Sequence, residues 1–463
     1  MSSPLSIDLD LIRRYDTTGP RYTSYPTAVH FSAHFSDIDY RRCAQLSNED
    51  PIPNPLSLYF HIPFCSTLCY YCACNKILTK VRSKAETYLR SLREEVRLQS
   101  ELFHSDRKVL QLHLGGGTPT FLTIRQIDQL LSTVSAHFAL ADEHDRDYSI
   151  EIDPRTVEAE DIFALRALGF NRISIGIQDF EPNVQAAVHR IQSYEHTLAV
   201  IVAARRAGFR SISVDLMYGL PLQTVSSFRS TLDKVLLADP DRICVFNYAH
   251  LPERFAPQRR ILDRDLPSPQ EKLEILINTL ECLDDAEYQY IGMDHFAKHD
   301  DDLSAAQRDG TLYRNFQGYA THANCDLLGM GVTSIGHVRD CYSQNTHNLD
   351  QYYRHIDAGR LAVSRGIELT HDDKLRAEII NQLMCYSRLN TNTVEQRHGI
   401  RFTDYFKGEL QALEGMEKDG LLVIQGNQIH LTLTGRLLVR NVCMIFDRYL
   451  HHDQPKKSFS RVI

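Results

Sequence analysis

Short apolar runs alternate with amphipathic stretches between residues 55 and 285. The apolar runs cover residues 56–62, 109–114, 148–153, 172–178, 211–220 and 242–251. The stretches of helical periodicity that follow them cover residues 84–103, 124–138, 158–170, 196–209, 226–237 and 269–283. This alternation predicts repeated βα units with a parallel sheet. Six such units, each right-handed, predict an α/β fold with a partial, (β/α)6-type TIM-like barrel.

Polar side chains follow the ends of the predicted strands. They are the cysteines after residue 64, the glycines at 115–117, and Glu151, Gln178, Asp215 and Asn247. In a parallel barrel the carboxyl ends of the strands meet on one face, where such folds place their sites. Any one of these residues could cap a helix or form a turn, but their shared position favours a common site. A further run at 288–297, "YQYIGMDHFA", could add a seventh strand.

The pattern differs at the two ends of the chain. Residues 1–50 show no clear period and contain Gly-Pro and Tyr-Pro steps, which favour extended or turn backbone. Beyond residue 365, helical stretches precede a short hairpin at 421–432 and predict a mostly helical, winged-helix-like domain that packs or acts as a lid. We therefore expect an N-terminal arm at 1–50, a catalytic barrel at 51–364 and a C-terminal domain at 365–463.

Composition indicates a globular protein. The chain has 463 residues, 43% of them hydrophobic and 24% charged, and a net charge of −8, so no nucleic-acid partner is expected. No apolar run approaches the roughly 20 residues that span a bilayer. The N-terminus lacks the basic-then-apolar layout of a secretory signal. We expect a cytoplasmic protein without a membrane partner.

Four of the 11 cysteines lie within ten positions, in "CSTLCYYCAC" from Cys65 to Cys74. Disulfides are not expected in a reducing compartment, and zinc sites usually join two separated pairs of ligands. Three thiolates spaced C-x3-C-x2-C suit an iron–sulfur cubane, which takes one cysteine per iron and would leave one iron open. A structural zinc site, in which the metal only helps the loop to fold, is the alternative.

This cysteine loop, after an apolar strand and with Tyr71 before the third cysteine, resembles the signature of the radical S-adenosylmethionine (SAM) superfamily. The resemblance implies a [4Fe–4S] cluster held by Cys65, Cys69 and Cys72, with SAM chelated by the open iron. Reductive cleavage of SAM would give a 5′-deoxyadenosyl radical that abstracts hydrogen from the substrate. Cys74 is not assigned as a ligand because a fourth thiolate would close the open iron.

Longer motifs resemble the oxygen-independent coproporphyrinogen III oxidase family within that superfamily. They include "GPRYTSYPT" at 19–27, "YFHIPFC" at 59–65, "LHLGGGTPT" at 112–120 and "FSRVI" at 459–463. The resemblance implies oxidative decarboxylation of two propionate side chains of coproporphyrinogen III to vinyl groups, giving protoporphyrinogen IX. It implies an unidentified electron donor and acceptor, and we expect a monomer. A haem-binding or haem-trafficking relative is the alternative, but such relatives lack Cys74 and the arm motif.

The resemblance also implies site residues and two SAM molecules in one site. The first molecule would lie near Tyr59, Gly116, Glu151 and Ile335, and the second near Tyr71, Gly117, Thr118, Gln178, Arg190, Asp215 and Ala249. Carboxylates suit ammonium or hydroxyl donors, and Arg190 suits a carboxylate, with a surface salt bridge as its alternative. Arg21, Tyr22 and His61 are candidates for propionate contact or site closure. A packed tyrosine and a helix-capping histidine are the alternatives for the last two.

Overall fold

The computed structural model describes residues 8–452, 459, 461 and 462. Its contacts group the chain into two compact units. The barrel unit contains Phe31–Cys282 and Asn324–Glu368, and the terminal unit contains the described residues within 1–30, 283–323 and 369–463. The domain boundaries predicted at residues 50 and 364 divide the chain into consecutive segments, whereas each of these units combines distant segments. The boundaries therefore stay a prediction.

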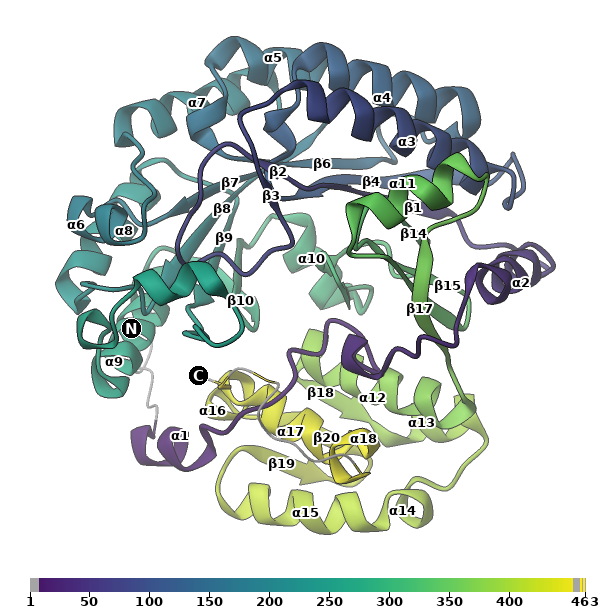
Figure 1. Ribbon diagram of the computed structural model, residues 1–463. Helices are drawn as coiled ribbons and strands as arrows, with labels where there is room; N and C mark the ends of the chain where they lie inside the picture. Colours follow the sequence, from purple (N-terminus) through teal and green to yellow (C-terminus); the bar gives the residue numbers. More distant parts are fainter. Residues whose placement is uncertain (1–7, 453–458, 460, 463) are drawn as a thin grey trace. The chain divides into compact units, whose positions relative to one another are not determined.

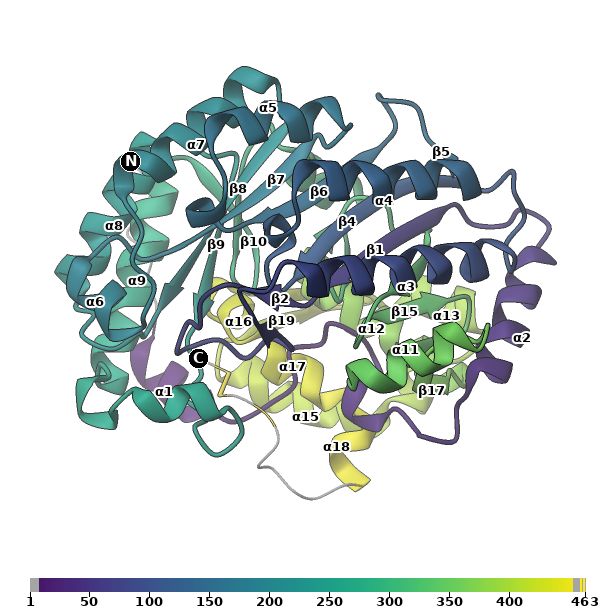
Figure 2. The same cartoon turned by 45° about the horizontal axis from the view of Figure 1, so that its top comes forward.

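The six expected strands are all present in the barrel unit. They are β1 (Leu56–Ile62), β4 (Lys108–Gly116), β6 (Asp147–Ile152), β7 (Arg172–Gln178), β8 (Ser211–Tyr218) and β9 (Arg242–Asn247). They lie in the order β9-β8-β7-β6-β4-β1, and neighbouring strands are parallel. Figure 2 shows β6, β7, β8 and β9 fanning out side by side. The partial parallel barrel is confirmed.

Helices cover the outer face of these strands, as Figure 1 shows. They are α3 (Ser83–Ser100), α4 (Ile124–His137), α5 (Ala159–Ala167), α6 (Pro182–Ala187), α7 (Tyr194–Ala207), α8 (Val225–Leu237) and the start of α9 (Pro269–Asp285). Local sequence fixes their ends. Thr123, for example, accepts a hydrogen bond from the Gln126 N–H, and the Gln126 side chain accepts one in return from the Thr123 N–H.

Apolar and polar side chains alternate along the strands, so the apolar ones pack in the core and the polar ones lie on the inner face. In β7, Ile173, Ile175 and Ile177 are buried. The intervening Ser174, Gly176 and Gln178 line a cavity. Because successive side chains of a strand point to opposite faces, one short sequence supplies both the packing and the site.

The sheet continues beyond β1 in a way that the sequence did not predict. Strand β14 (Asp326–Met330) pairs parallel to β1, and β15 (Ile335–Val338), β16 (Cys341–Asn345) and β17 (Val363–Glu368) follow as antiparallel neighbours. Helix α11 (Leu349–Asp357) connects β16 to β17. These strands are short, and no helix separates β14, β15 and β16, so the βα pattern does not reveal them.

A fully buried carboxylate joins α3 to this extension. Glu95 accepts hydrogen bonds from the Gly331 N–H, the Asn345 side-chain amide and the Tyr352 hydroxyl, each at 2.7 Å. Burial raises the pKa of Glu95 to about 7, and no cation among the described residues offsets this effect. Glu95 therefore links three segments through neutral donors.

The described residues of the arm expected at 1–50 include two α-helices. Helix α1 (Leu9–Tyr15) lies in the terminal unit, whereas α2 (Asp37–Asn48) lies in the barrel unit. Ser36 and Asp39 form a capping box at the start of α2. The absence of a clear period at 37–48 was therefore misleading, because α2 buries a narrow face that includes Tyr40, Cys43 and Ala44.

The segment at 288–297, suggested as one further strand, forms two short strands. This segment is an antiparallel hairpin of β10 (Tyr288–Gly292) and β11 (His295–Lys298) in the terminal unit. Gly292 has φ +153° and precedes Met293 at φ +53°, so the backbone turns in the middle of the run.

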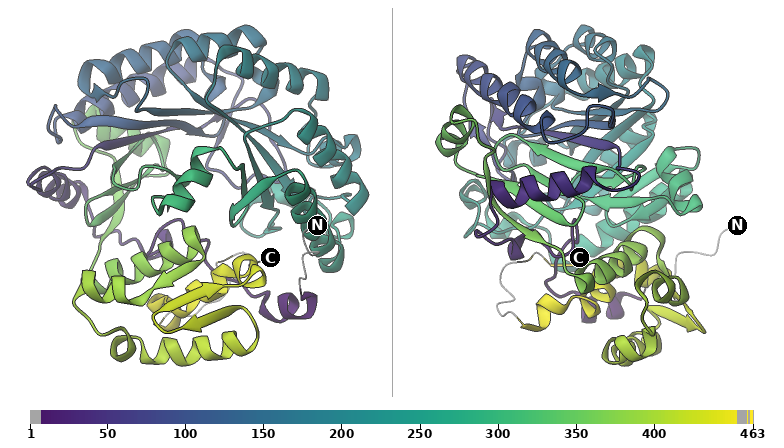
Figure 3. Two further views of the ribbon diagram at one scale, coloured as in Figure 1. Left: turned by 180° about the vertical axis from the view of Figure 1, so that it is seen from behind. Right: turned by 90° about the vertical axis from the view of Figure 1, so that its right-hand side faces the viewer.

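The terminal unit is mostly helical and carries the expected hairpin. Strands β19 (Leu422–Gln425) and β20 (Gln428–Leu431) pair antiparallel, and β18 (Arg388–Asn390) pairs with β20. Its other elements are α10 (Asp302–Asp309), β12 (Tyr313–Asn315), β13 (Gly318–Ala320), α12 (His371–Tyr386), α13 (Thr391–His398), α14 (Phe402–Tyr405), α15 (Lys407–Lys418), α16 (Leu433–Leu437), α17 (Val439–Ile445) and α18 (Arg448–His452). The left view of Figure 3 shows the hairpin and helices in green to yellow. None of the described helices combines the length and apolarity needed to cross a membrane.

Candidate active site

A cavity of about 870 Å³ opens at the carboxyl ends of the parallel strands of the barrel unit. Most of the residues predicted for the site line it. They are Cys65, Cys69, Tyr71, Cys72, Gly116, Gly117, Thr118, Glu151, Gln178, Arg190 and Asp215. The predicted convergence of the strand ends on one site is therefore what the structure shows.

The cysteine loop is anchored along both of its sides. It runs between β2 (Phe64–Cys65) and β3 (Ile77–Leu78), which pair in parallel. The Thr79 N–H donates to the Cys65 carbonyl at 3.0 Å, and the Tyr70 N–H donates to the Val188 carbonyl at 2.9 Å. These bonds hold the loop beside the cavity.

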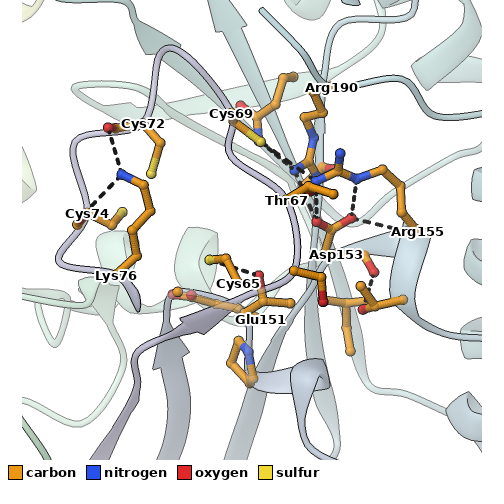
Figure 4. A pocket seen from close by; sticks show the side chains of 18 of the residues that line it. Cys65, Thr67, Cys69, Cys72, Cys74, Lys76, Glu151, Asp153, Arg155 and Arg190 are labelled. Atoms are coloured by element: carbon orange, nitrogen blue, oxygen red, sulfur yellow. Dashed lines mark hydrogen bonds and ion pairs between the residues drawn. The ribbon is translucent and has the colours of Figure 1, made fainter. Parts of the chain in front are cut away.

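The thiols of Cys65, Cys69 and Cys72 face a common space from different sides, as Figure 4 shows. Cys65 and Cys69 are buried, Cys72 is half-buried and Cys74 is exposed. Within the described residues, no three His, Cys, Asp or Glu side chains form a ligand group for a single ion. A [4Fe–4S] cluster takes one cysteine per iron, and three thiols around a shared space fit that requirement.

The three thiols have unlike surroundings. Burial raises the pKa of Cys65 to about 11, although its sulfur accepts a hydrogen bond from the Thr118 hydroxyl at 3.4 Å. A hydrogen bond from the Cys74 thiol lowers the pKa of Cys72 to about 6. Cys69 instead lies against two guanidinium groups.

The glycine loop after β4 approaches the cysteine loop closely. A Cβ atom on Gly116, which has φ +116°, would lie 2.7 Å from the His61 ring, and one on Gly117 would lie 2.8 Å from the Pro63 carbonyl. The Gly117 N–H donates to the Ile62 carbonyl at 2.8 Å. Only glycine leaves room for this contact, so the turn packs against the cysteine loop, and its approach to a ligand stays a prediction.

Two carboxylates face the cavity from β6 and β8. Glu151 accepts from the Gly116 N–H at 3.1 Å and lies 3.2 Å from His113 Nε2. Asp215 accepts from the Ser174 hydroxyl at 3.0 Å. Burial, followed by the negative charge of Glu151, raises the pKa of Asp215 to about 6. At neutral pH both groups can accept hydrogen bonds from a ligand.

Gln178 lies at the end of β7 in a strained conformation. Its φ is +68°, and the β7–β8 pairing is irregular between Gly176 and Gln178. Its side-chain oxygen is buried without a hydrogen-bond partner among the described residues. A bulge that re-aims a side chain, together with an unpaired buried acceptor, is typical of a ligand-binding position.

Arg190 is not a surface residue. Its side chain is 8% exposed and its Nη1 lies 3.3 Å from the Asp153 carboxylate. It also donates to the Gly176 carbonyl at 2.6 Å and to the Gln192 side chain at 3.1 Å. The alternative of a surface salt bridge is therefore wrong, because the ion pair is buried and lines the cavity.

Tyr59, Ala249 and Ile335 do not line this cavity. Tyr59 stacks on His113, with 5.7 Å between ring centroids, and its hydroxyl lies 3.2 Å from His61 Nδ1. Ile335 begins β15 and packs its backbone against Gly329, which pairs with Tyr59 in β14. Ala249 lies two residues after β9 and is half-buried. Tyr59 and Ile335 therefore belong to the β1–β14–β15 side of the barrel unit.

The candidates for substrate contact divide between the two units. His61 lies in β1, buried next to Gly116, and does not cap a helix. In the terminal unit Tyr22 is buried in the core, and its hydroxyl donates to Asp447 at 3.0 Å. Arg21 forms an ion pair with Asp294. Packing accounts for Tyr22, and the contact roles of Arg21 and His61 stay predictions.

Three charged residues that line the cavity were not predicted from the sequence. Lys76 donates to the carbonyl oxygens of Cys72 and Cys74 at 3.1 and 3.5 Å. Asp153 and Arg155 form an ion pair with 2.6 Å between Oδ2 and Nη2. Both lie in "IEIDPR" directly after a strand end, and that position was the available indication.

Comparison with known proteins identifies the family. Residues 59–235 match the radical SAM superfamily, and residues 369–438 match the HemN C-terminal domain. The oxygen-independent coproporphyrinogen III oxidase of Pseudomonas aeruginosa is 50% identical over 456 residues, covering 98% of each chain. The chain belongs to the oxygen-independent coproporphyrinogen III oxidase family.

Other members of the oxidase family agree over the same length. The Escherichia coli enzyme of that name is 49% identical, again over 98% of each chain. The solved structure of coproporphyrinogen III oxidase (HemN) from Escherichia coli, described as a radical SAM enzyme, superposes with a TM-score of 0.91 and 47% identity, covering 96% of this chain and all of that one. These relatives favour the oxidase over the haem-binding alternative.

Proposed function

We propose that the protein is an oxygen-independent coproporphyrinogen III oxidase. It converts two propionate side chains of coproporphyrinogen III to vinyl groups and yields protoporphyrinogen IX. The observation that carries this function is a three-cysteine loop facing a polar cavity at the strand ends, in a chain that matches the oxidase family over 98% of its length.

The enzyme binds a [4Fe–4S] cluster and SAM. Cys65, Cys69 and Cys72 would hold the cluster, and Cys74 would stay outside the ligand set. When bound, the group supplies one electron to SAM and so gives access to radical chemistry. The substrate requires that chemistry because the β-hydrogen of a propionate is unactivated, and no side-chain base could remove it as a proton at neutral pH.

The chain's own residues bind and orient SAM. Backbone groups of Gly116 and Gly117 approach the ligand closely, and the carboxylates of Glu151 and Asp215 accept from its ammonium or hydroxyl groups. All three guanidinium nitrogens of Arg190 donate to protein partners. Nη2 carries two N–H groups, however, and the Gly176 carbonyl accepts from only one of them. That remaining N–H can bind a carboxylate.

We assign two SAM molecules to this site. The support is the separation of the predicted residues into two groups. Tyr59 and Ile335 lie on the β1–β14–β15 side, whereas Gln178, Arg190 and Asp215 lie on the β7 and β8 side of the cavity. The unpaired oxygen of Gln178 suits a donor on the second molecule, such as an amino or hydroxyl group.

The enzyme acts as a cytoplasmic monomer, supplied by an external one-electron donor and discharging to a separate acceptor. The residues that line the cavity all belong to the barrel unit, so a monomer would carry the whole lining. The described residues include every cysteine of the chain, and all of them are free thiols, as a reducing compartment requires. Light scattering after size-exclusion chromatography tests the monomer.

Anaerobic turnover tests the function. Reconstituted protein is incubated with dithionite, SAM and coproporphyrinogen III, and the products are separated by mass spectrometry. We expect 5′-deoxyadenosine, CO2 and vinyl-bearing porphyrinogen. Protein that carries its full iron and yet forms no vinyl product would exclude the oxidase, and stoichiometric haem binding without turnover would favour the haem-binding alternative.

A further inference from the structure

Two arginines from different elements approach the same cysteine sulfur. Arg155 Nη2 and Arg190 Nη1 each donate to Cys69 Sγ at 3.7 Å. Figure 4 shows both guanidinium groups converging on this sulfur and on the carboxylate of Asp153. Cys69 therefore has two cationic N–H donors before any ligand is considered.

Asp153 fixes the direction of both guanidinium groups. Its Oδ1 accepts from Arg155 Nε at 2.9 Å and its Oδ2 from Arg155 Nη2 at 2.6 Å, a bidentate contact. The same Oδ2 lies 3.3 Å from Arg190 Nη1. A planar guanidinium held at two points cannot rotate freely, so its remaining N–H stays aimed at the sulfur.

The three charged groups are largely withdrawn from water. The side chains of Asp153, Arg155 and Arg190 are 10%, 18% and 8% exposed. Although burial opposes ionisation, Arg190 and Arg155 hold the pKa of Asp153 below its usual range, so the group carries one negative and two positive charges. Charges act more strongly on one another where water is excluded.

The thiols of Cys65 and Cys72 have other partners. Cys65 Sγ accepts from a neutral hydroxyl, that of Thr118. The pKa of Cys72 is lowered by a neighbouring thiol and by the single cation of Lys76, which also donates to two backbone carbonyls. Within the described residues, Cys69 is the thiol of this loop whose sulfur accepts from guanidinium groups.

We propose that Asp153 and Arg155 are positioning residues that, together with Arg190, aim cationic donors at the Cys69 sulfur and raise the reduction potential of the cluster. The proposal rests on the proposed function, because it requires the cluster. N–H donors draw electron density from a ligand thiolate and stabilise the electron that an external one-electron donor adds. Asp153 and Arg155 would make the cluster easier to reduce by acting through Cys69, whereas Arg190 would also bind SAM.

The test is the midpoint potential of the anaerobically reconstituted protein. It is measured by dithionite titration with redox mediators and followed by electron paramagnetic resonance. In Arg155→Gln we expect the equilibrium constant for one-electron reduction to fall about tenfold, which corresponds to about 59 mV more negative. Arg155→Lys keeps a cation but loses the fork, so its shift has the same sign and is smaller.

Arg82→Gln is the matched control. Arg82 also lines the cavity, but its guanidinium donates to the Phe121 carbonyl and stacks on the Phe121 ring. We expect its potential to equal that of the unaltered protein. An unshifted potential in Arg155→Gln, or an equal shift in Arg82→Gln, would overturn the proposal. If Arg155→Gln binds no cluster, Arg155→Lys decides in the same way.

The measurement separates this proposal from the function on which it rests. The potential is read without substrate and without turnover. A shifted potential in a protein that forms no vinyl product would reject only the proposed function. Normal product formation with an unshifted potential would reject only the role of Arg155 and Asp153.

Discussion

Two carboxylates of the barrel unit, both largely withdrawn from water, are surrounded by different kinds of hydrogen-bond donor. Asp153, at the cavity, lies between two guanidinium groups, and its pKa is depressed. Glu95, between α3 and the antiparallel strands, accepts from three neutral donors, and burial raises its pKa to about 7. The surroundings of Asp153 stabilise its ionised form, whereas those of Glu95 favour its protonated form up to about pH 7.

The difference indicates what each region does. Burying charged groups has a desolvation cost, and removing one partner leaves the others uncompensated. At the cavity, the guanidinium groups held in this way point at a cysteine sulfur. Neutral donors around a carboxylate hold segments together and require no fixed charge. The cavity is thus organised around charges, and the Glu95 network around hydrogen bonds.

The largest effect is expected when the cavity loses a cluster ligand. Cys65→Ser should reduce vinyl formation to background and remove most of the bound iron, because one iron loses its thiolate. Iron analysis and product assay check this, and circular dichroism should be unchanged. Cys74→Ser is the control and should keep its iron. Global unfolding of Cys65→Ser would instead indicate a purely structural metal site.

Removing the charge of Asp153 should destabilise the barrel unit. Asp153→Asn leaves two buried guanidinium groups uncompensated, so we expect the free energy of unfolding to fall by roughly 3–5 kcal/mol. Urea unfolding of the cluster-free protein at pH 7.5 measures it. Glu143→Gln breaks the exposed pair with Arg166 and should cost much less, because exposed ion pairs contribute little to stability. If Asp153→Asn and Glu143→Gln lost equal free energies of unfolding, the buried charge of Asp153 would have no special role in stability.

The same acid-to-amide change at Glu95 should cost less. Glu95→Gln keeps an acceptor but turns an amide donor toward other donors, so we expect a loss of about 1–3 kcal/mol. Glu94→Gln, on the exposed side of α3, is the control, with a change below about 0.5 kcal/mol. A larger loss than in Asp153→Asn would reverse the comparison.

Glu95 also gives stability a pH dependence of defined sign. Its pKa rises on folding from 4.5 to about 7, so across that interval the folded chain keeps a proton that the unfolded chain has lost. The contribution of Glu95 to the free energy of unfolding therefore decreases as pH rises from about 4.5 to 7. Unfolding at pH 5.5 and 7.5 should show a shallower decrease in Glu95→Gln, and an unchanged slope would contradict this assignment.

The smallest effect concerns the binding of SAM. Asp215 has a pKa raised to about 6, so it loses its charge as pH falls below that value. If the ionised form accepts from the ligand, the binding constant for SAM should fall up to about tenfold per pH unit below pH 6. Anaerobic equilibrium binding between pH 5 and 8 checks this, and Asp215→Asn should bind more weakly and without that pH dependence.

The sequence predicted the strand ends well because their pattern is local. The bounds of β1 and β7 were predicted to the residue, and Gln178 and Asp215 follow from their places on the strands. Glycines 116 and 117 could be placed beside the cysteine loop because both loops follow neighbouring parallel strands.

Features that depend on distant partners could not be predicted. Glu95 stands in "LREEVRL", where it looks like any exposed helical acid, and only β16 and α11 reveal its burial. The clamp of Asp153 on Arg190 joins residues 37 positions apart. The strands β15 to β17 and the turn at Gly292 interrupt the βα period, so extrapolating that period gave one strand at 288–297 where the chain forms a two-stranded hairpin.

Spectroscopy of the anaerobically reconstituted protein tests the central claim most directly, by comparing its dithionite-reduced electron paramagnetic resonance signal with and without SAM. Three thiolates around one space predict about four irons per chain and a [4Fe–4S] signal that changes when SAM binds the open iron. Zinc in place of iron, or a cluster signal that SAM leaves unchanged, would contradict the account.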